Sequence, residues 1–583
     1  MQGVTTSSTA NLISTLSLKG KKWVLNQPSE VSVLNLIQKY NFPEVVAHLI
    51  AQRCPEHLDV HKFLSTKIKD YFQDPFSLKD MPQAIDRICR AIDKGEKIGI
   101  LGDYDVDGAT STSLFLKYFE ALGIDVIYHI PDRITEGYGP SRQGIDFFAS
   151  KDVSLIITVD CGTAAHEVLS YAQKKGIDVV VVDHHIPEEE LPQAVAIVNP
   201  NREDDKSGLG HLCAAGVSFF VLAALQKKQD PLSKRINLLS LLDLVALGTV
   251  CDVVPLKGIN KAFVSQGLRI MEKGLNPGIQ TLFDSLSVTP PLSEYHLGYV
   301  VGPHINAGGR IGLASLGTEL LTAKTPQKAL SIVQELVRLN TERKALEGQM
   351  IEESIQMAEV YKNDRVICLG LDGWHPGVIG IVASRIKEKF GKPSFIIGFD
   401  AEGLGKGSGR SVKGVNLGDL VQKAKDQGLL VNGGGHEMAA GLTLQQEKLD
   451  SLRQFFNQNT QKPPPAESLI DVTVSISGIH LDLIDWVEKV GPFGAGNPQP
   501  VFMIPNCMFQ DFQIRKEKHI SFRLRGEEGK TLEGMAFNVV GTALESAFKK
   551  DSAAHVIGRL QADTWQGKKR IKFYLEDVII PTQ

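Results

Sequence analysis

The sequence predicts a multidomain α/β protein, and three observations support this fold class. The chain has 583 residues, which is too long for a single hydrophobic core. Apolar runs alternate with stretches of helical periodicity over residues 96–325, an order typical of a parallel sheet with right-handed crossovers. Short alternating runs separated by polar turns fill residues 470–583, as expected of a small β-barrel.

We expect six segments along the chain. Residues 329–361 lack proline and contain one glycine, and their apolar residues have helical spacing, so one long helix is expected there. A stretch of three prolines at 463–465 indicates a linker. The segments are a mostly helical N-terminal region (1–95), a parallel-sheet domain (96–325), a connecting helix (326–362), a second α/β domain (363–456), the linker (457–469) and a C-terminal β-barrel (470–583).

Three aspartates at alternate positions follow the first apolar run of the sheet domain. Asp103, Asp105 and Asp107 follow residues 97–101, which have the pattern of a buried parallel strand, after one intervening glycine. Like charges this close repel one another, and each is costly to bury without a compensating cation. The motif therefore favours a divalent metal site at the mouth of the sheet. A solvated acidic turn or a calcium loop is the alternative, although an EF-hand also needs flanking helices and a glutamate at its twelfth position.

Acidic and imidazole side chains also end three later apolar segments. These residues are Asp160, Asp183, His184, His185 and Asp252. Because all strands of a parallel sheet open on the same edge, we expect these side chains to converge with the first three aspartates in one cleft. Any one of them alone could be a helix cap or an ordinary surface residue.

The residue types indicate manganese or magnesium. Carboxylate oxygens with one or two imidazoles suit these ions better than structural zinc, and no cysteine cluster accompanies them. The carboxylates are numerous enough for two divalent cations about 3.5–4 Å apart that share one bridging aspartate. Such a pair activates water and neutralises charge on a phosphoryl group, so hydrolysis of phosphate esters is the expected reaction class.

Two glycine-rich stretches in the second α/β domain are candidates for substrate binding. Residues 405–410 (Gly-Lys-Gly-Ser-Gly-Arg) let backbone amides, a hydroxyl and a guanidinium approach a phosphate closely. Residues 433–436 (Gly-Gly-Gly-His) also permit close backbone approach and add a polar side chain. Most glycine-rich stretches are only turns, so each one alone is weak evidence.

The net charge of −4 does not by itself suggest a nucleic-acid enzyme. The acidic metal motif contributes to that charge, and bound cations would offset it. Basic residues are concentrated at 515–525 and 568–572, where aromatic residues lie among and beside them. This combination suits a single strand of nucleic acid, which offers both backbone charge and stacking bases. A solvated β-hairpin with ordinary surface charge is the alternative.

Composition indicates an intracellular globular protein. Hydrophobic residues make up 43% and charged residues 22% of the chain, which is ordinary for such proteins. The 7 cysteines are scattered and odd in number, which favours free thiols in a reducing compartment. We find no secretory signal and no apolar run of membrane-spanning length, so we expect a soluble, cytoplasmic protein.

The ordered series of motifs resembles that of the DHH phosphoesterases. The motif of residues 103–108, the aspartate at 160, the tripeptide 183–185 and the aspartate at 252 match that superfamily in order and spacing. Within it, the chain is most similar to the bacterial RecJ single-stranded-DNA exonuclease family, and the resemblance covers nearly the whole chain. Further matching stretches are residues 74–76, 302–310, 339–344, 373–380, 407–411 and 433–436. The resemblance implies a DHH domain, a DHH-associated domain and an oligonucleotide-binding (OB) barrel.

The resemblance also implies a role for each candidate metal-site residue. One divalent cation, Mn²⁺ or Mg²⁺, would be held by Asp103, Asp105 and Asp160. The other would be held by Asp107, Asp160, His184 and Asp252, so that Asp160 bridges the two ions. Asp183 would support a neighbouring histidine, and His185 would face the scissile phosphate as a donor.

For the substrate, the resemblance implies a clamp on the 5′-terminal phosphate. The residues of this clamp would be Arg310, Ser408 and Arg410. The strand would also contact Gly433, Gly434, Gly435 and His436. A narrow cleft between the two α/β domains would then admit a single strand and exclude a duplex.

The implied activity is 5′-to-3′ degradation of single-stranded DNA to 5′-mononucleotides during recombination and repair. The implied partners are a single-stranded-DNA-binding protein and a RecQ-type helicase, and a monomer is expected. Two positions depart from the usual family pattern: His304 stands where arginine is more usual, and Leu313 stands where an acidic residue is frequent. These departures leave the metal residues intact but bear on strand contacts.

Three other functions share some of these motifs. A small DHH oligoribonuclease or cyclic-dinucleotide phosphodiesterase would lack the N-terminal region and the C-terminal barrel. A manganese pyrophosphatase would carry a different second domain. A non-catalytic DNA-binding scaffold would have lost metal ligands, whereas every expected ligand is present here.

Overall fold

The computed structural model describes residues 16–56, 58–133, 135–228, 236–549, 552–565 and 568–581. The chain forms two compact units. Unit 1 comprises Met1–Asp70, Leu256–Lys261 and Pro465–Gln583, and unit 2 comprises Tyr71–Pro255 and Ala262–Pro464. The N-terminal region expected at 1–95 is thus divided between the two units, because its helices pack on different cores.

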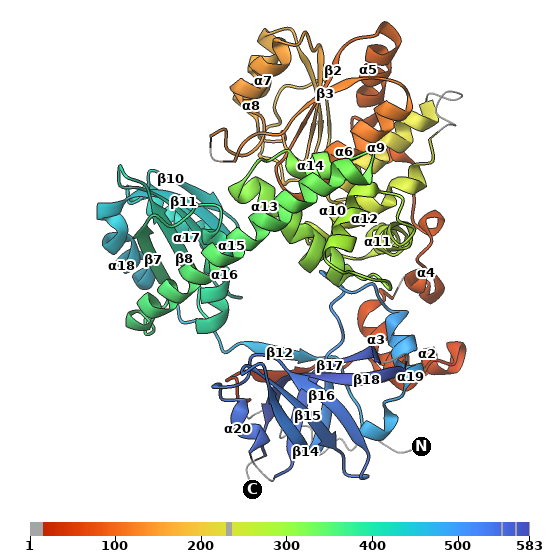
Figure 1. Ribbon diagram of the computed structural model, residues 1–583, viewed down its shortest axis with the longest axis vertical. Coiled ribbons are helices and arrows are strands. Elements are labelled where there is room, and N and C mark those ends of the chain that lie inside the picture. The colour runs from red at the N-terminus through yellow and green to blue at the C-terminus, as the bar shows by residue number, and fades with distance from the viewer. Residues whose placement is uncertain are drawn as a thin grey trace. The chain divides into compact units, whose positions relative to one another are not determined.

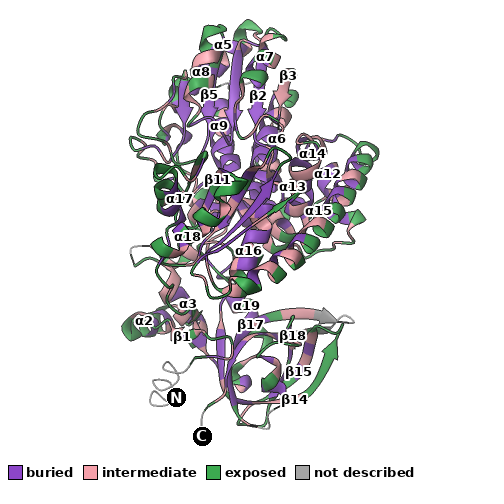
Figure 2. Cartoon of the chain, turned by 90° about the vertical axis from the view of Figure 1, so that its left-hand side faces the viewer, coloured by how far each residue is buried: buried purple, intermediate pink, exposed green. Residues whose placement is uncertain are grey.

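Unit 2 contains the parallel sheet that the sequence predicts. Its strand order is β3-β2-β4-β5-β6, and every pair of neighbours is parallel. The strands are β2 (Ile98–Gly102), β3 (Val126–His129), β4 (Leu155–Val159), β5 (Asp178–Val182) and β6 (Ala196–Val198). Strands β2 and β4 are buried along their whole length, and Figure 2 shows the buried centre of the sheet. Their continuous apolar runs are what a sheet covered on both faces requires.

The helices of this domain follow the expected alternation with the strands. They are α5 (Met81–Lys94), α6 (Val106–Ala121), α7 (Arg142–Ala149), α8 (His166–Lys174), α9 (Ala214–Lys228) and α10 (Leu242–Cys251). Helix α6 packs against both α9 and α10. Its small residues 108–113 are all buried, which lets the three helices approach one another closely. This contact places the N-termini of α6 and α9 together at the carboxyl edge of the sheet.

A group of helices leads from the first sheet to the long helix. These are α11 (Gly258–Met271), α12 (Pro277–Ser285), the π-helix η5 (His296–Val301), α13 (Gly302–Ile311), α14 (Leu316–Leu321) and α15 (Pro326–Val360). The long helix α15 has 35 residues, and Thr325 caps it by accepting from the Lys328 amide. It packs on α12, α13 and α14 and then on α16 and β7 of the second sheet (Figure 1). The predicted long helix is therefore present.

The second α/β domain of unit 2 has a mixed sheet of order β10-β11-β9-β8-β7. Its strands are β7 (Ile367–Asp372), β8 (Ser394–Phe399), β9 (Leu404–Arg410), β10 (Asn432–Gly435) and β11 (Ala439–Gln445). Its helices are α16 (Ile379–Phe390), α17 (Leu417–Asp426) and α18 (Leu449–Asn459). Along β9, Gly405, Gly407 and Gly409 lie over aromatic and aliphatic side chains of β8, and the polar residues between them face the other side.

Adding a methyl group at Gly409 is expected to destabilise this domain. A Cβ there would lie 2.3 Å from Cε1 of Phe395, whose ring is buried and stacked on Phe456 at 4.6 Å. We expect Gly409→Ala to lower the free energy of unfolding by about 1–3 kcal/mol, measured by chemical denaturation. Gly434→Ala is the matched control, because a Cβ at Gly434 meets nothing within 4 Å. Equal stability of the two variants would contradict this packing.

Unit 1 contains the predicted C-terminal barrel. Strands β14 (Phe502–Arg515), β15 (His519–Arg525), β16 (Thr531–Ala536), β18 (Lys568–Ile579) and β17 (Ala554–Trp565) pair in that order, and β17 pairs back with β14. This pairing closes a five-stranded barrel and confirms the predicted fold class. The short strand β13 (Val472–Thr473) extends it in parallel with β14. Helices α19 (Leu481–Glu488) and α20 (Glu545–Phe548) complete this part of the unit.

N-terminal elements of unit 1 share the core of the barrel. Helices α2 (Glu30–Tyr40) and α3 (Glu44–Arg53) contribute buried side chains to the same cluster as the barrel strands. A strand, β1 (Lys22–Leu25), pairs in parallel with β12 (Glu467–Ile470), so this region is not purely helical. Helix α4 (Val60–Leu64) follows α3 along the chain. Within the described ranges, no helix combines the length and the apolarity needed to cross a membrane.

Candidate metal and phosphate site

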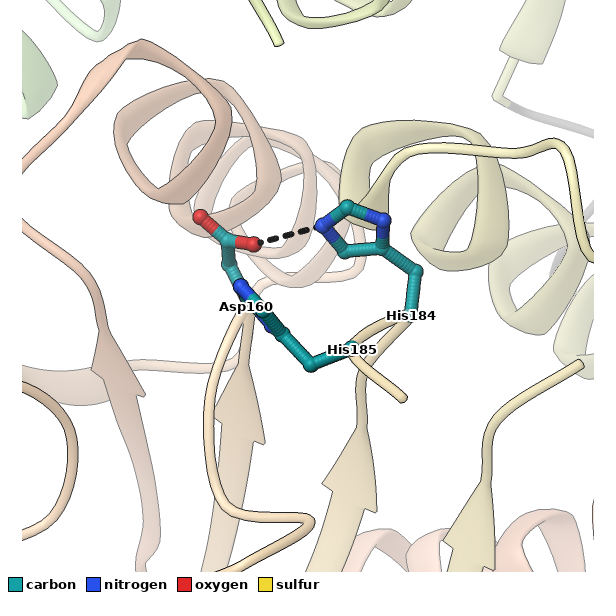
Figure 3. A group of neighbouring side chains, drawn as sticks. All are labelled: Asp160, His184 and His185. Carbon is teal, nitrogen blue, oxygen red and sulfur yellow. Dashed lines mark ion pairs between the residues drawn. The ribbon is translucent and has the colours of Figure 1, made fainter. Parts of the chain in front are cut away.

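The candidate metal ligands lie where three adjacent strands end. Asp103 follows β2, Asp160 follows β4, and the tripeptide 183–185 follows β5. Because β2, β4 and β5 are parallel neighbours, their carboxyl ends bring these side chains to one edge. Figure 3 shows Asp160 and His184 at the ends of neighbouring strands, with the imidazole facing the carboxylate.

Two of the aspartates are fixed by helix N-termini. Asp105 is the N-cap of α6, and its Oδ1 accepts from the amides of Asp107 and Gly108 at 2.8 and 3.1 Å. Asp107 is buried, and its two oxygens accept from the Ala214 and Ala215 amides at the start of α9, at 2.6 and 3.0 Å. Helix α9 thus holds the Asp107 carboxylate at its positive end.

Asp160 occupies a backbone conformation that few residues with side chains adopt. Its φ is 62°, in the left-handed region, and its amide donates to the Val182 carbonyl at 3.1 Å. Its own carbonyl accepts from the Tyr138 hydroxyl at 3.0 Å. Strain of this kind persists where the surroundings hold a residue for a function. Here it turns the carboxylate into the cluster.

His184 lies at the centre of the cluster. Its Nε2 is 3.3 Å from Oδ1 of Asp160, 3.6 Å from Oδ2 of Asp252 and 3.8 Å from Oδ2 of Asp107. Three buried atoms of this cluster have no hydrogen-bond partner among the described residues: Oδ1 of Asp103, Nε2 of His184 and Oδ2 of Asp252. Buried polar atoms are normally satisfied, so these orphaned ligand atoms fit a cation between them.

The ligand atoms form three overlapping groups, each within 4.8 Å. The groups are Asp103–Asp105–Asp160, Asp107–His184–Asp252 and Asp160–His184–His185. The first group has the three residues that the family resemblance implies for one ion, and the second has three of the four that it implies for the other, without Asp160. Asp160 belongs to the first and third groups and lies 3.3 Å from His184 of the second, which fits a bridging position. All the donors are carboxylate or imidazole, as Mn²⁺ and Mg²⁺ sites prefer.

Three aspartates of the cluster, Asp103, Asp160 and Asp252, have strongly raised pKa values. Burial and the neighbouring Asp105 carboxylate raise the pKa of Asp103 to about 8. Burial and the Asp107 carboxylate raise the pKa of Asp252 to about 8 and place that of Asp160 well above its usual range. Gathering these carboxylates without counter-ions is therefore unfavourable, and divalent cations would relieve the repulsion.

Asp183 holds the two histidines rather than joining the three groups. Its Oδ1 accepts from the His184 amide, the His185 amide and His185 Nδ1 at 2.7, 3.2 and 2.7 Å, and its Oδ2 accepts from the Thr163 amide at 3.1 Å. Burial alone would raise the pKa of Asp183, but the bond and charge of His185 hold it below its usual range. Burial alone would lower the pKa of His185, but the Asp183 bond raises it to about 9.

A basic pocket lies in the same unit, between the two α/β domains. Its volume is about 890 Å³, and its lining includes Arg310 of α13, Ser408 and Arg410 of β9, and Gly433 and Gly434 of β10. Arg410 Nη1 donates to Ser408 Oγ at 2.9 Å, and Arg310 Nη1 donates to the Gly377 carbonyl at 3.0 Å. Burial, Arg133 and Arg343 together lower the pKa of Arg310 to about 10. An anion in the pocket would offset this repulsion between cations.

Comparison with known proteins matches the three parts of the chain in order. The DHH family, N-terminal domain, matches residues 97–249, the DHHA1 domain matches 363–462 and the RecJ OB domain matches 470–577. The single-stranded-DNA-specific exonuclease RecJ of Bacillus subtilis (strain 168) is 33% identical over 572 residues, which cover 96% of this chain and 71% of that protein. The chain belongs to the RecJ family.

Other RecJ proteins are similar over most of their length. The Escherichia coli (strain K12) enzyme is 33% identical over 526 residues, 86% of this chain and 90% of its own. The crystal structure of Thermus thermophilus RecJ in complex with Mn²⁺ has a TM-score of 0.79 and 26% identity, covering 96% of this chain and 80% of that one. A crystal structure of exonuclease RecJ bound to manganese has a TM-score of 0.57 and 32% identity, covering 67% and 96%.

Two residues beside the site of this RecJ chain lie outside the residue set that we inferred from the sequence. Arg133 lines the basic pocket and lies over the Tyr104 ring at 5.2 Å. Tyr138 contacts the Asp160 carbonyl and the ring nitrogens of His185. Both belong to the loop after β3, which is a parallel strand of the same sheet. Their position after a strand end is the signal that could have identified them.

The other strand-contact residues of the RecJ pattern are placed as follows. Gly435 and His436 are not among the residues that line the pocket, although the adjacent Gly433 and Gly434 are. His304 is buried on α13, with Nδ1 2.6 Å from the Val300 carbonyl, and burial lowers its pKa. Leu313 is exposed. Neither departure from the family pattern lies among the three ligand groups.

Proposed function

We propose that this protein is a 5′-to-3′ exonuclease that degrades single-stranded DNA to 5′-mononucleotides with two divalent cations. The observation that carries the proposal is that the ligand groups and the basic pocket lie in one unit, with Arg133 of the pocket over the ring of Tyr104, between Asp103 and Asp105, at 5.2 Å. Membership of the RecJ family supports single-stranded DNA as the substrate. We also propose a role in recombination and repair, in the cytoplasm and as a monomer, with a single-stranded-DNA-binding protein and a RecQ-type helicase as partners.

The metal residues are proposed to act as two sets of ligands. Asp103, Asp105 and Asp160 hold one cation, and Asp107, Asp160, His184 and Asp252 hold the other. Bound Mn²⁺ or Mg²⁺ would supply positive charge that stabilises the transition state of phosphodiester hydrolysis. Asp183 positions His184 and His185 through its three bonds to them. His185 in its protonated form donates from Nδ1 to Asp183 and can donate from Nε2 to the scissile phosphate.

The basic pocket is proposed to set the direction of cleavage. Arg310, Ser408 and Arg410 hold the 5′-terminal phosphate, and Gly433 and Gly434 allow the strand to approach the backbone. Gly435 and His436 follow directly and are proposed to contact the strand outside the pocket. Anchoring one end beside the cluster measures off one nucleotide. The barrel of unit 1 binds the rest of the strand through its basic and aromatic side chains.

End-labelled substrates test this function. A single strand with a 5′-phosphate and a 3′ label, incubated with Mn²⁺, should shorten from its 5′ end and release mononucleotides. A duplex of the same sequence is expected to resist. Shortening from the 3′ end would contradict the direction, and cleavage of dinucleotides or short RNA alone would favour the oligoribonuclease. Binding without any cleavage would favour the scaffold.

Loss of the Asp183 carboxylate should slow catalysis without preventing strand binding. In Asp183→Asn an NH2 group, which donates and cannot accept a hydrogen bond, replaces one carboxylate oxygen, so at least one of the bonds to Thr163, His184 and His185 is lost. We expect kcat to fall by about 10–100-fold, the usual cost of losing a group that supports metal ligands. Asp178→Asn, at the other end of β5, is the control. Equal kcat for Asp183→Asn and wild type would refute the positioning role.

A further inference from the structure

The basic pocket is larger than a single terminal phosphate requires. Its volume of about 890 Å³ is in the range that holds a whole small-molecule ligand. Among the described residues, the lining includes five cationic side chains and no carboxylate: Arg133, Arg310, Arg385, Lys406 and Arg410. The proposed phosphate clamp uses Arg310, Ser408 and Arg410. The side chains of Lys406, Thr443 and Asn432, which also line the pocket, therefore have no role in the function proposed above.

Three strands in register build the floor of this pocket. Ser408 of β9 is paired with Gly441 of β11, which is paired with Gly434 of β10. A Cβ on either glycine would meet no atom within 4 Å. We call these three cross-strand partners the first rung. It presents open backbone beside the Ser408 hydroxyl. It leaves space for a ligand to pass along β9, away from Arg410.

The next rung on the same face carries three polar side chains. Lys406 is paired with Thr443, and Thr443 is paired with Asn432. Because side chains alternate along a strand, Lys406 and Ser408 face the same side, about 7 Å apart. All three residues line the pocket, and Lys406 forms no ion pair with any residue that the structure describes. Arg385, by contrast, pairs with Glu388 at 3.2 Å.

We propose that this second rung binds the outer phosphates of a single strand whose 5′ end carries a diphosphate or triphosphate. The proposal rests on the function proposed above, because Ser408 and Arg410 must hold the phosphate nearest the sugar. The outer phosphates then lie along β9 toward Lys406, Thr443 and Asn432. These side chains supply an ammonium, a hydroxyl and an amide as donors.

Cleavage of such a strand follows the same bond chemistry as cleavage of a monophosphorylated one. Water adds to the phosphorus of the first internucleotide linkage, the P–O3′ bond breaks, and the 3′ oxygen of the terminal nucleotide takes up a proton. A triphosphorylated strand therefore yields a nucleoside 5′-triphosphate first, and the shortened strand keeps a 5′-monophosphate.

Binding of matched oligonucleotides tests the second rung. The probes are 3′-labelled single strands of one sequence with a 5′-hydroxyl, monophosphate or triphosphate, titrated in EDTA and followed by fluorescence anisotropy. We expect the wild type to bind the triphosphate about tenfold more tightly than the monophosphate, the gain from charge-assisted hydrogen bonds to the outer phosphates. Lys406→Met should bring this ratio close to one, whereas Lys406→Arg should retain it. Lys423→Met, at an exposed position of α17 outside the pocket lining, is the matched control.

Two binding results would overturn the inference. One is equal affinity of the wild type for the monophosphate and the triphosphate. The other is an equal loss of affinity for both strands in Lys406→Met, which would place Lys406 on the DNA backbone instead. In either case the phosphate clamp would stand, because the comparison of hydroxyl and monophosphate ends tests it separately.

Product analysis with Mn²⁺ gives an independent readout. Chromatography of the first product from the triphosphorylated strand should give a nucleoside triphosphate. Release of phosphate or pyrophosphate, or resistance of that strand alone, would overturn the inference and leave the proposed exonuclease intact. Resistance of the monophosphorylated strand as well would overturn the proposed function and the inference together.

Discussion

Asp160→Ala is expected to lower the rate of single-strand cleavage by more than about 100-fold. Loss of a group that only supports metal ligands costs about 10–100-fold, and Asp160 is proposed to contact both ions directly. Its carboxylate belongs to two of the three ligand groups and lies 3.3 Å from His184 Nε2. Single-turnover cleavage of a 5′-phosphorylated strand with saturating Mn²⁺ measures the effect.

The control for this prediction is a buried carboxylate outside the cluster. Asp243 lies on α10 and is 4% exposed, and burial raises its pKa to about 6. Asp243→Asn should therefore keep the cleavage rate near that of the wild type. Asp160→Ala should still bind the strand, because the basic pocket and the barrel are unchanged. A cleavage rate of Asp160→Ala equal to that of the wild type would contradict the assignment of Asp160 as the bridging ligand.

Arg410→Ala is expected to remove the preference for a 5′-phosphate. The guanidinium is partly buried and bonded to Ser408, and an anion in the pocket would gain its charge-assisted hydrogen bonds. Losing one or two such bonds should lower kcat/KM on 5′-phosphorylated strands by roughly 10–100-fold. Strands with a 5′-hydroxyl should be affected much less. The measurement is the ratio of kcat/KM for the two ends.

Arg338→Gln provides the matched control for Arg410. Arg338 is an exposed residue of α15 that pairs with Glu335 and Glu342 on its own helix and does not line the pocket. Its loss should leave the end preference unchanged. An equal reduction of kcat/KM on both kinds of end in Arg410→Ala would show that this arginine binds the strand and not its terminal phosphate.

The location of the metal cluster could be predicted because it depends on local sequence and on one rule of topology. Each apolar run identified a strand, and the residue after it identified the strand end. A parallel sheet then required Asp103, Asp160 and Asp183 to meet at one edge. The long helix and the barrel were predictable for similar reasons, since their periodicity is sustained over many residues.

Features that depend on tertiary packing could not be predicted in this way. The position of Arg133 after a strand end marks it as close to the cluster, but the sequence of its loop does not specify that its side chain reaches the basic pocket. His185 has a ligand atom within 4.8 Å of those of Asp160 and His184, and it also bonds to Asp183. Sequence spacing does not say whether His185 is a metal ligand or a partner of Asp183. The division of residues 1–95 between two units follows from which core α2, α3 and α5 pack against, and helical periodicity does not specify the partner.

Manganese stoichiometry is the most direct test of the proposed site. Protein stripped of metal with EDTA and dialysed should bind two Mn²⁺ per chain in a calorimetric titration. Asp160→Ala should lose at least one of these sites, while Asp243→Asn should keep both. Binding of two ions with dependence on Asp160 would support the shared-ligand cluster. Binding of a single ion by the wild type, or two ions that Asp160→Ala leaves unaffected, would contradict it.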